Sequence, residues 1–385
     1  MFQVAHIGYR VVLGQTADLH RELMKRDDVG SFFLVERLVD TGVAPDKNTH
    51  YFIKVPRNSV LDRADRALTE RIFRAPYEAQ LERFYRRYIR ELNIDIVHAH
   101  FGMAACKLEN VRKWCALPLL VTFYGVDASL CLKSDYWLPR LKRLFEYGDY
   151  FIVLSEKVKE RLAEHGCEPR KIKVWNCLVD FSVTYRARSY DGGAVKILTA
   201  ARFVEKKGYP LLLRAIADLI SRGMKAHLTI VGYGEEKQRI ARLIRDLGMD
   251  DAVTVFDTSG MRDFGTFYNG LLGTHHIFAL ASTTSKKGDD EAGPALSLIS
   301  AQAAGLPVVC TPFVGSERSV VDGETGIVAR EDEKDFASRL EYLIRNPHTW
   351  NVIGKKGSDC VRREFSIKGQ TDKMMEIYRE ILGRE

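Results

Sequence analysis

The chain has 385 residues, of which 46% are hydrophobic and 28% charged, a balance typical of a soluble globular protein with room for two domains. No apolar run approaches the ~20 residues of a membrane-spanning helix, and the seven scattered cysteines form no C-x-x-C pair, which argues against a disulfide framework or zinc site and suits reduced thiols in a cytosol. The net charge of +7 favours anionic partners, such as nucleotides or an acidic membrane surface.

Strand-like and helix-like segments alternate through the first half. The first residues, Met1–Gly8, have a strand pattern and lack the basic start and cleavage site of a secretion signal. Strands are predicted at Phe2–Gly8, Ser31–Glu36, Tyr51–Val55, Asp95–His100, Leu119–Phe123, Tyr150–Leu154 and Lys171–Trp175. Helices are predicted at Thr16–Lys25, Ala79–Leu92 and Lys157–His165.

A basic amphipathic region lies between the third and fourth predicted strands. Its arginines alternate with Leu, Ile, Phe and Tyr, and they are Arg63, Arg66, Arg71, Arg74, Arg83, Arg86, Arg87 and Arg90. Such a region can rest on anionic lipid headgroups. The alternative is an ordinary surface helix, because Asp62, Asp65, Glu70, Glu78 and Glu82 offset much of the charge.

Apolar periodicity stops at 185–193, a polar, glycine-bearing stretch typical of a linker, and then resumes. Later strands are predicted at Val195–Ala201, Ala226–Gly232, Ala252–Phe256, His276–Ala281 and Pro307–Thr311. Later helices are predicted at Pro210–Ser221, Lys237–Leu247, Ala295–Ala304, Asp332–Arg345 and Thr371–Leu382.

This repeated alternation predicts an α/β fold with two domains, each a parallel sheet covered by helices on both faces. The domains are expected at residues 1–185 and 194–365, facing a cleft in which substrates meet. The C-terminal helix, about 366–385, is amphipathic and is expected to pack back on the first domain.

The segment Ala201–Gly208 carries Arg202 and Lys207 on a strand-to-helix loop, at the carboxyl edge of the second predicted sheet. Ligands of open α/β folds bind at that edge, and the next helix adds partial positive charge from its N-terminus. The loop therefore suits a phosphate or diphosphate. The alternative is a solvated basic turn.

Two further loops carry candidate residues. Gly232 and Gly234 form a tight turn after a strand, which is weak evidence for a ligand because glycines also close strand-helix corners. Glu291 lies on an acidic, glycine-bearing loop that opens a helix, where it could bind sugar hydroxyls or simply cap the helix.

Together these segments resemble glycosyltransferase family 4, the retaining, metal-independent enzymes of the GT-B fold, and in particular the branch that builds bacterial exopolysaccharides of the colanic-acid type. The matching segments run in family order over most of the chain. They are Asp95-Ile-Val-His-Ala-His-Phe-Gly102, Val121-Thr-Phe-Tyr-Gly-Val-Asp127, Arg202…Glu205-Lys-Lys-Gly208, Val231-Gly-Tyr-Gly234, the Glu291 loop, Ala303-Ala-Gly-Leu-Pro-Val-Val309 and Gly315-Ser-Glu317…Gly323…Thr325-Gly326.

The resemblance implies a role for each matched residue. Arg202 and Lys207 would bind the donor diphosphate and stabilise it as it leaves, and Glu291 would contact the transferred sugar. The donor-binding set would be Gly232, Gly234, Gly293, Pro294, Ala295, Ser300 and Glu317. The acceptor side would hold Gly14, His100, Tyr124 and Asp127. No cofactor or metal is implied.

Three positions depart from the family pattern. The family has a second glutamate eight positions after the first, which usually binds the nucleotide ribose. Counting forward from Glu291 reaches Ile299, whereas counting back from Ala303-Ala-Gly-Leu-Pro307 reaches Ser300 and puts the first glutamate at Ala292 unless the loop carries a one-residue insertion. Either way the second carboxylate is absent. Tyr124 replaces a histidine, and Asn176-Cys-Leu-Val-Asp180 replaces Asn-Gly-Val-Asp. A serine bonds a ribose without charge assistance, a difference of roughly 1 kcal/mol.

The expected function is transfer of a hexosyl group from a nucleotide-diphosphate sugar to a glycolipid or oligosaccharide acceptor in surface-polysaccharide synthesis. The protein is expected in the cytoplasm, at the inner face of the membrane, without a nucleic-acid partner. One alternative is a catalytically impaired GT-B protein that binds nucleotide or acts as a scaffold. Another GT-B enzyme, such as a nucleotide-sugar epimerase, fits less well because it lacks the likeness at 95–127.

Overall fold

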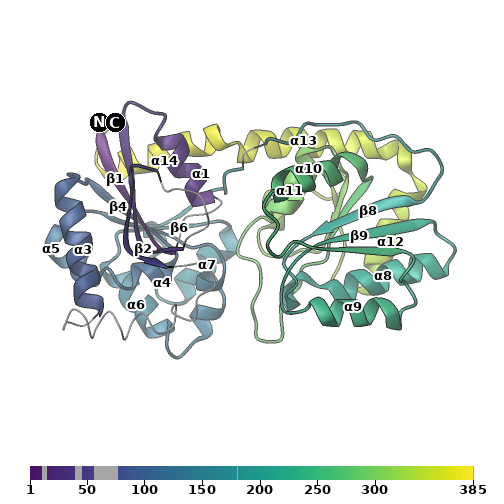
Figure 1. The fold of residues 1–385 in the computed structure, drawn as a ribbon, viewed down its shortest axis with the longest axis horizontal. Coiled ribbons are helices and arrows are strands. Elements are labelled where there is room, and N and C mark those ends of the chain that lie inside the picture. Colours follow the sequence, from purple (N-terminus) through teal and green to yellow (C-terminus); the bar gives the residue numbers. More distant parts are fainter. Residues whose placement is uncertain (11–14, 40–45, 56–76, 180, 385) are drawn as a thin grey trace. The chain divides into compact units, whose positions relative to one another are not determined.

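The computed structural model describes the chain except for residues 11–14, 40–45, 56–76, 180 and 385. The chain forms two compact units, each an α/β structure around a parallel sheet (Figure 1). Unit 1 comprises Met1–Leu178 and Ile367–Glu385, and unit 2 comprises Val179–Ser366. The α/β fold predicted from the alternating pattern is therefore confirmed. Residues 179–185, which the sequence assigns to the first domain, belong to unit 2.

Within the described residues, the sheet of unit 1 has the strand order β3-β2-β1-β4-β5-β6-β7, and all pairs are parallel. The strands are β1 (Phe2–Arg10), β2 (Val29–Val39), β3 (Thr49–Val55), β4 (Ile96–His100), β5 (Leu119–Thr122), β6 (Tyr150–Val153) and β7 (Ile172–Val174). β4 and β5 are buried along their whole length. β5 has a nearly continuous apolar sequence because helices cover both faces of a parallel sheet, whereas the buried β4 also carries His98 and His100.

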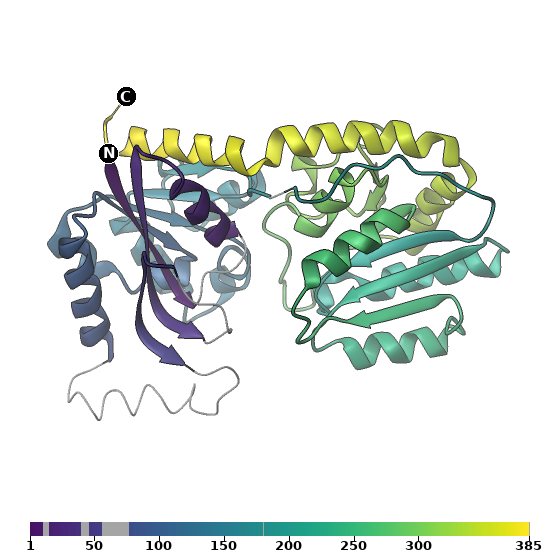
Figure 2. The ribbon, with the colours of Figure 1, turned by 45° about the horizontal axis from the view of Figure 1, so that its top comes forward.

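The described helices of unit 1 are α1 (Gln15–Leu23), α3 (Tyr77–Glu91), α4 (Gly102–Ala105), α5 (Glu109–Cys115), α6 (Leu138–Tyr147), α7 (Glu156–Glu164) and α14 (Ile367–Ile381). The C-terminal helix α14 lies beside α1 (Figure 2). Its Met374, Met375 and Tyr378 are fully buried in one apolar cluster with Phe2 and Leu19. The end of the chain is therefore part of the core of unit 1.

The sheet of unit 2, within the described residues, has the order β10-β9-β8-β11-β12-β13, again parallel throughout. Its strands are β8 (Val195–Ala200), β9 (Ala226–Gly232), β10 (Val253–Asp257), β11 (Ile277–Leu280), β12 (Val308–Cys310) and β13 (Ile327–Val328). Its helices are α8 (Tyr209–Ser221), α9 (Lys237–Asp246), α10 (Phe264–Thr274), α11 (Leu296–Ala303), α12 (Glu333–Arg345) and α13 (Trp350–Phe365).

Alternate residues of β8 face two separate cores. Ile197 packs with side chains of α8, α9 and α12, whereas Leu198 packs with side chains of α10 and α11. The period of two along a strand produces this division, and helices therefore cover both faces. The chain runs from β8 to β9 and β10 on one side, then returns to β11 on the other side of β8. The loops after β8 and β11 consequently leave the same sheet edge in opposite directions, which creates a topological switch point.

The stretch at 185–193 does not behave as a free linker. Arg188 is buried and donates hydrogen bonds to the carbonyl oxygens of Leu272 (2.8 Å), His275 (3.1 Å) and Ala304. Burial lowers the pKa of this guanidinium to about 10. One side chain thus fixes a segment whose composition predicts a flexible connection.

No helix in the described part of the chain is both long and apolar enough to span a membrane.

Candidate active site

Lys207 and Glu291 form an ion pair at the switch point of unit 2. Lys207 lies on the 3₁₀ turn Glu205–Lys207 after β8, and Glu291 lies on the loop after β11. Their side chains are only 12% and 13% exposed, and Ser282 donates a second hydrogen bond to Glu291 Oε1 at 3.1 Å. The structure therefore brings together two of the three residues that the sequence predicts to be catalytic.

Opposing effects set the protonation of Glu291. Burial alone would raise the pKa of its carboxyl group. The ammonium groups of Lys207 and Lys206, and the hydrogen bonds from Lys207 and Ser282, outweigh burial and hold the pKa below its ordinary value. Glu291 is therefore an ionised hydrogen-bond acceptor at neutral pH, a state suited to binding hydroxyl groups.

A glycine shapes the turn that carries Lys207. Gly208 has a φ of +62°, ends the 3₁₀ turn and caps α8 at its N-terminus. Left-handed backbone of this kind favours glycine because it has no Cβ atom. The turn directs Lys206 and Lys207 toward the loop after β11, and the first turn of α8 starts at the same sheet edge.

The glycines after β9 are explained by packing. A Cβ atom on Gly232 would lie 1.9 Å from the Ala201 carbonyl oxygen, and one on Gly234 would lie 2.4 Å from that of Phe203. Phe203 also donates its amide to the carbonyl of Tyr233 at 2.7 Å. Gly232 and Gly234 thus let the β8–α8 loop lie against the β9 loop. Donor binding by these glycines stays a prediction.

Gly293, Pro294 and Ala295 are buried in the loop that leads into α11. A Cβ atom on Gly315 would lie 2.3 Å from the Gly293 carbonyl carbon, so the loop after β12 packs closely on this segment. Glu317 is exposed on that loop and accepts a 3.0 Å hydrogen bond from the Gly315 amide. This bond turns the Glu317 carboxylate back on its own loop.

Arg202 and Ser300 stand apart from the Lys207–Glu291 pair. Arg202 is exposed, and in the described part of the chain its guanidinium makes no hydrogen bond or ion pair. Ser300 is half-buried on α11, and no hydrogen bond among the described residues joins it to Glu291 or Lys207. An exposed cation with no partner among the described residues is available to a ligand, whereas Lys207 is already paired.

His100 and Tyr124, two of the residues predicted for the acceptor side, form one hydrogen-bonded pair in unit 1. The distance between His100 Nδ1 and the Tyr124 hydroxyl is 2.7 Å. Burial, and secondarily the charge of Asp127, raises the pKa of Tyr124, so the phenol keeps its proton at neutral pH. Tyr124 can therefore donate or accept a hydrogen bond but is not a base.

Asp127 is fully buried and accepts backbone hydrogen bonds with both carboxylate oxygens. Oδ1 accepts from Tyr124 (3.1 Å) and Gly125 (2.9 Å), and Oδ2 accepts from Gly102 (2.9 Å). Burial raises its pKa, although these amides counter the effect. The structure thus shows Asp127 holding the loop of Tyr124 in place, and direct contact with an acceptor stays a prediction.

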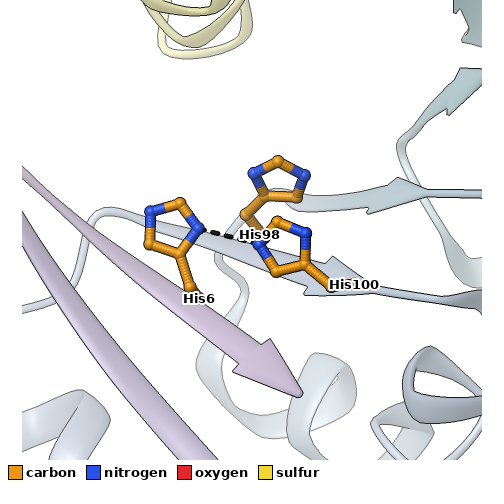
Figure 3. Close-up of side chains that lie close together, drawn as sticks. All are labelled: His6, His98 and His100. Atoms are coloured by element: carbon orange, nitrogen blue, oxygen red, sulfur yellow. Dashed lines mark hydrogen bonds between the residues drawn. The ribbon is translucent and has the colours of Figure 1, made fainter. Parts of the chain in front are cut away.

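Three buried histidines of unit 1 are close enough to hold a metal ion, since their candidate ligand atoms lie within 4.8 Å of one another. Figure 3 shows His6 from β1 and His98 and His100 from β4 as a compact group. His6 Nδ1 and His100 Nε2 are hydrogen-bonded at 2.9 Å, so one proton lies between them. The nitrogens of His98 are hydrogen-bonded to the hydroxyls of Tyr378 (2.6 Å) and Thr122 (2.7 Å).

These bonds favour a neutral network over a metal centre. A hydrogen bond between two imidazole nitrogens uses the lone pair of one and the proton of the other, whereas a metal needs a lone pair from each ligand. Burial first, and then the neighbouring histidines, lower the pKa values of His6, His98 and His100 well below 6.5. The sequence did not single out His6 or His98, because the family resemblance gave a role to His100 alone among the three.

Some predicted features lie outside the described residues. They are Gly14 on the acceptor side and Arg63, Arg66, Arg71 and Arg74 of the basic region. The arginines of α3 are described. Arg86 pairs with Glu82 at 2.7 Å and Arg87 with Glu91 at 2.9 Å, so part of the basic charge is neutralised within the helix.

Sequence reasoning missed Lys206, Asp289 and Ser282. Lys206 is buried and pairs with Asp289 at 3.1 Å, and Ser282 binds Glu291. The tandem lysines at 206–207 and the acidic run at 289–291 have complementary charges, and that complementarity was an available signal.

Two family models match consecutive parts of the chain. The model described as Glycosyltransferase Family 4 matches residues 39–183, and the model described as Glycosyl transferases group 1 matches residues 186–359. A putative colanic acid biosynthesis glycosyltransferase of Salmonella typhimurium is 30% identical over 277 residues, which cover 71% of this chain and 67% of the relative. An amylovoran biosynthesis glycosyltransferase of Erwinia amylovora is 27% identical over 244 residues, which cover 62% of this chain and 58% of the relative.

Solved structures share the fold over nearly the whole chain. Sucrose-phosphate synthase from Thermosynechococcus elongatus matches with a TM-score of 0.75 at 16% identity, covering 100% of both chains. Anabaena HepE in complex with UDP and glucose matches with a TM-score of 0.75 at 15% identity, covering 99% of this chain and 100% of the other. The family models, the relatives and the two parallel sheets agree: the chain belongs to glycosyltransferase family 4 and is a glycosyltransferase of the GT-B fold.

Proposed function

We propose that the enzyme transfers a sugar from a nucleotide-diphosphate sugar to a glycolipid or polysaccharide acceptor in bacterial surface-polysaccharide synthesis, with retention of configuration and without a metal ion. The observation that carries the proposal is the Lys207–Glu291 pair at the switch point, with the exposed Arg202 on the same loop as Lys207. The names of the colanic acid and amylovoran relatives support the polysaccharide product. The UDP complex of HepE supports a nucleotide donor.

In this mechanism, Arg202 and Lys207 bind the diphosphate and stabilise the negative charge that develops as it leaves. Two cations and the N-terminus of α8 supply the stabilisation that a metal provides in other transferases. Lys207 has three ammonium hydrogens, so it can bind the diphosphate without releasing Glu291. Glu291, ionised and buried, accepts hydrogen bonds from hydroxyls of the transferred sugar.

The acceptor is proposed to be held at the inner face of the cytoplasmic membrane. The net charge of +7 and the basic region at 63–90 support this location. The ion pairs of Arg86 and Arg87 within α3 reduce the free charge of that helix. Co-sedimentation with anionic and with neutral vesicles tests the contact: binding to both equally, or to neither, would contradict it.

A panel of UDP-, GDP- and ADP-sugars tests the proposed reaction. We expect one donor to raise the melting temperature of the wild type and to support transfer, and the Arg202→Ala and Lys207→Ala variants to lose that rise. No binding and no turnover with any donor would refute the proposal. A rise in melting temperature that survives both substitutions would refute the site. Nucleotide binding without transfer, unrestored by Ser300→Glu, would favour the scaffold alternative.

A further inference from the structure

Glu291 lies on a long loop without regular secondary structure. The loop begins after β11, at Ala281, and ends at Ala295, where α11 starts. Loops of this length inside compact domains are uncommon, and a functional group on one must be fixed by other contacts. A displacement of about 1 Å at a reacting centre can cost about 10²-fold in rate. The contacts that fix Glu291 are therefore part of the site.

The tip of the loop is bonded to itself. Ser285 donates its amide to the Asp289 carbonyl at 2.8 Å, and Asp289 donates its amide to Ser285 Oγ at 2.9 Å. Gly288 closes the turn with a φ of +76° and a 2.8 Å bond to the Ser285 carbonyl. These bonds shape the tip but do not attach it to the sheet.

Lys206 attaches the loop on both sides of that tip. Its ammonium group donates to Asp289 Oδ1 at 3.1 Å and to the Asp290 carbonyl at 2.7 Å, while its own carbonyl accepts from the Thr283 amide at 2.8 Å. The Lys206 side chain is 6% exposed, compared with 23% for Asp289. Two of its three ammonium hydrogens are therefore used within the protein, in a nearly closed environment.

We propose that Lys206 is a positioning residue for sugar transfer: by holding Asp289 and Asp290, it fixes the carboxylate of Glu291 against Lys207. The inference rests on the proposed function. Adjacent lysines on one turn then have different tasks. Lys206 binds the two residues before Glu291, and Lys207 binds Glu291 itself and remains the one to contact the diphosphate.

The decisive comparison is Lys206→Met, which keeps an unbranched side chain, one heavy atom shorter, and removes its charge. Lys225→Met is the matched control, because Lys225 is exposed and precedes β9, at the opposite edge of the sheet. We expect kcat to fall by about 10²-fold in Lys206→Met, while the Kd for UDP, GDP or ADP, whichever stabilises the wild type, changes by less than about threefold. The control should match the wild type.

A double-mutant cycle tests whether Lys206 acts through the loop. Asp289→Ala should also lower kcat. The double variant should be no slower than Lys206→Met alone, because Lys206→Met already breaks the contact that Asp289→Ala removes. A wild-type kcat in Asp289→Ala, together with a weakened nucleoside diphosphate Kd in Lys206→Met, would overturn the proposal and place Lys206 on the donor. If Lys206→Met does not fold, Asp289→Ala alone tests the loop, with Lys206 intact.

A further readout does not depend on activity. Lys286 and Lys287 are exposed on the loop and are trypsin sites. We expect trypsin to cleave at these two lysines faster in Lys206→Met and Asp289→Ala than in the wild type and in Lys225→Met. Mass spectrometry of timed samples measures the cleavage rates. Equal cleavage rates would overturn the positioning role. If the two variants are cleaved faster but the wild-type protein transfers no sugar, the contact between Lys206 and the loop is supported and the proposed function is refuted.

Discussion

Gly208 lies so close to Ala281 that a Cβ atom added to it would be 1.8 Å from the Ala281 carbonyl oxygen. This approach joins the loop after β8 to the loop after β11, and so brings Lys207 to Glu291. The backbone itself, and not only the charges, therefore sets the distance across the site.

Gly208→Ala should disrupt the site. The new methyl group meets a backbone oxygen and also imposes a left-handed conformation on alanine, a cost of about 1–3 kcal/mol for the conformation alone. Gly223→Ala is the control, because Gly223 also has a positive φ, of +81°, but nothing within 4 Å of an added Cβ. Urea unfolding and transfer rates should show a larger stability loss at position 208 and a rate loss there alone. Equal effects at both positions would mean that the close approach is unimportant.

Removing Lys207 should destabilise unit 2 more than neutralising its partner. Lys207→Met leaves a buried carboxylate unpaired, and breaking a buried pair in this way costs about 3–5 kcal/mol. Glu291→Gln keeps a polar group at the site, and the double variant should recover much of the loss. Urea denaturation of the four proteins completes the cycle. Additive losses would show that the two groups do not interact.

The same pair predicts a dependence on pH. The pKa of Glu291 is held below its ordinary value of 4.5, so its ionised form stabilises the folded state. That contribution is fully present above pH 4.5 and is lost as the pH falls through the lowered pKa. The stability difference between wild type and Glu291→Gln should therefore be constant from pH 7 to 5 and shrink in more acidic buffer. A difference that grows on acidification would contradict this sign.

The histidine network of unit 1 should make the protein sensitive to mild acid. The pKa values of His6, His98 and His100 lie well below 6.5, so the unfolded chain binds more protons than the folded one as the pH falls below 6.5. Each such group costs up to about 1.4 kcal/mol per pH unit. His6→Gln should reduce the slope of stability between pH 6.5 and 5, measured by urea unfolding. An unchanged slope would indicate that His6 is protonated in the folded state.

Chelation tests the metal-independent mechanism. We expect that EDTA leaves the transfer rate unchanged. His6 and His100 share a proton, and the loop after β8 carries two cations, Arg202 and Lys207, that can bind a diphosphate without a metal ion. Added Zn²⁺ should not raise the melting temperature. A chelated enzyme that is inactive and recovers with one divalent ion would contradict the mechanism, and a rise in melting temperature with Zn²⁺ that His6→Gln abolishes would contradict the description of the histidines as a neutral network.

The strands were predictable because parallel strands with two covered faces are largely apolar, and the observed ends differ from the predicted ones by at most three residues. β13, with only two residues, gives no such signal. Helix α13 was not predicted, and it contains two glycines, Gly354 and Gly357, which weaken a helical pattern in a sequence. Gly354 serves the packing instead, since a Cβ atom there would lie 2.2 Å from the Gly305 carbonyl oxygen.

The site was only partly predictable for a related reason. Lys207 and Glu291 could be paired because each follows a strand of one sheet, and such strand ends share an edge. The partners of Lys206 could not be assigned, because the sequence around the two adjacent lysines does not indicate which of them is buried. Likewise, the partner of His98 in β4 is Tyr378, which lies 280 positions later, on the last helix.

That late partner has a consequence for synthesis. Unit 1 starts before unit 2 in the chain but also needs α14, which follows unit 2 and supplies Tyr378 to His98 and the Gln370 carbonyl to the Trp175 indole at 3.1 Å. A ribosome adds about 5–20 residues per second. All of unit 2 is therefore synthesised before α14, so the unit whose translation starts earlier has to wait for a core helix that is made after the other unit.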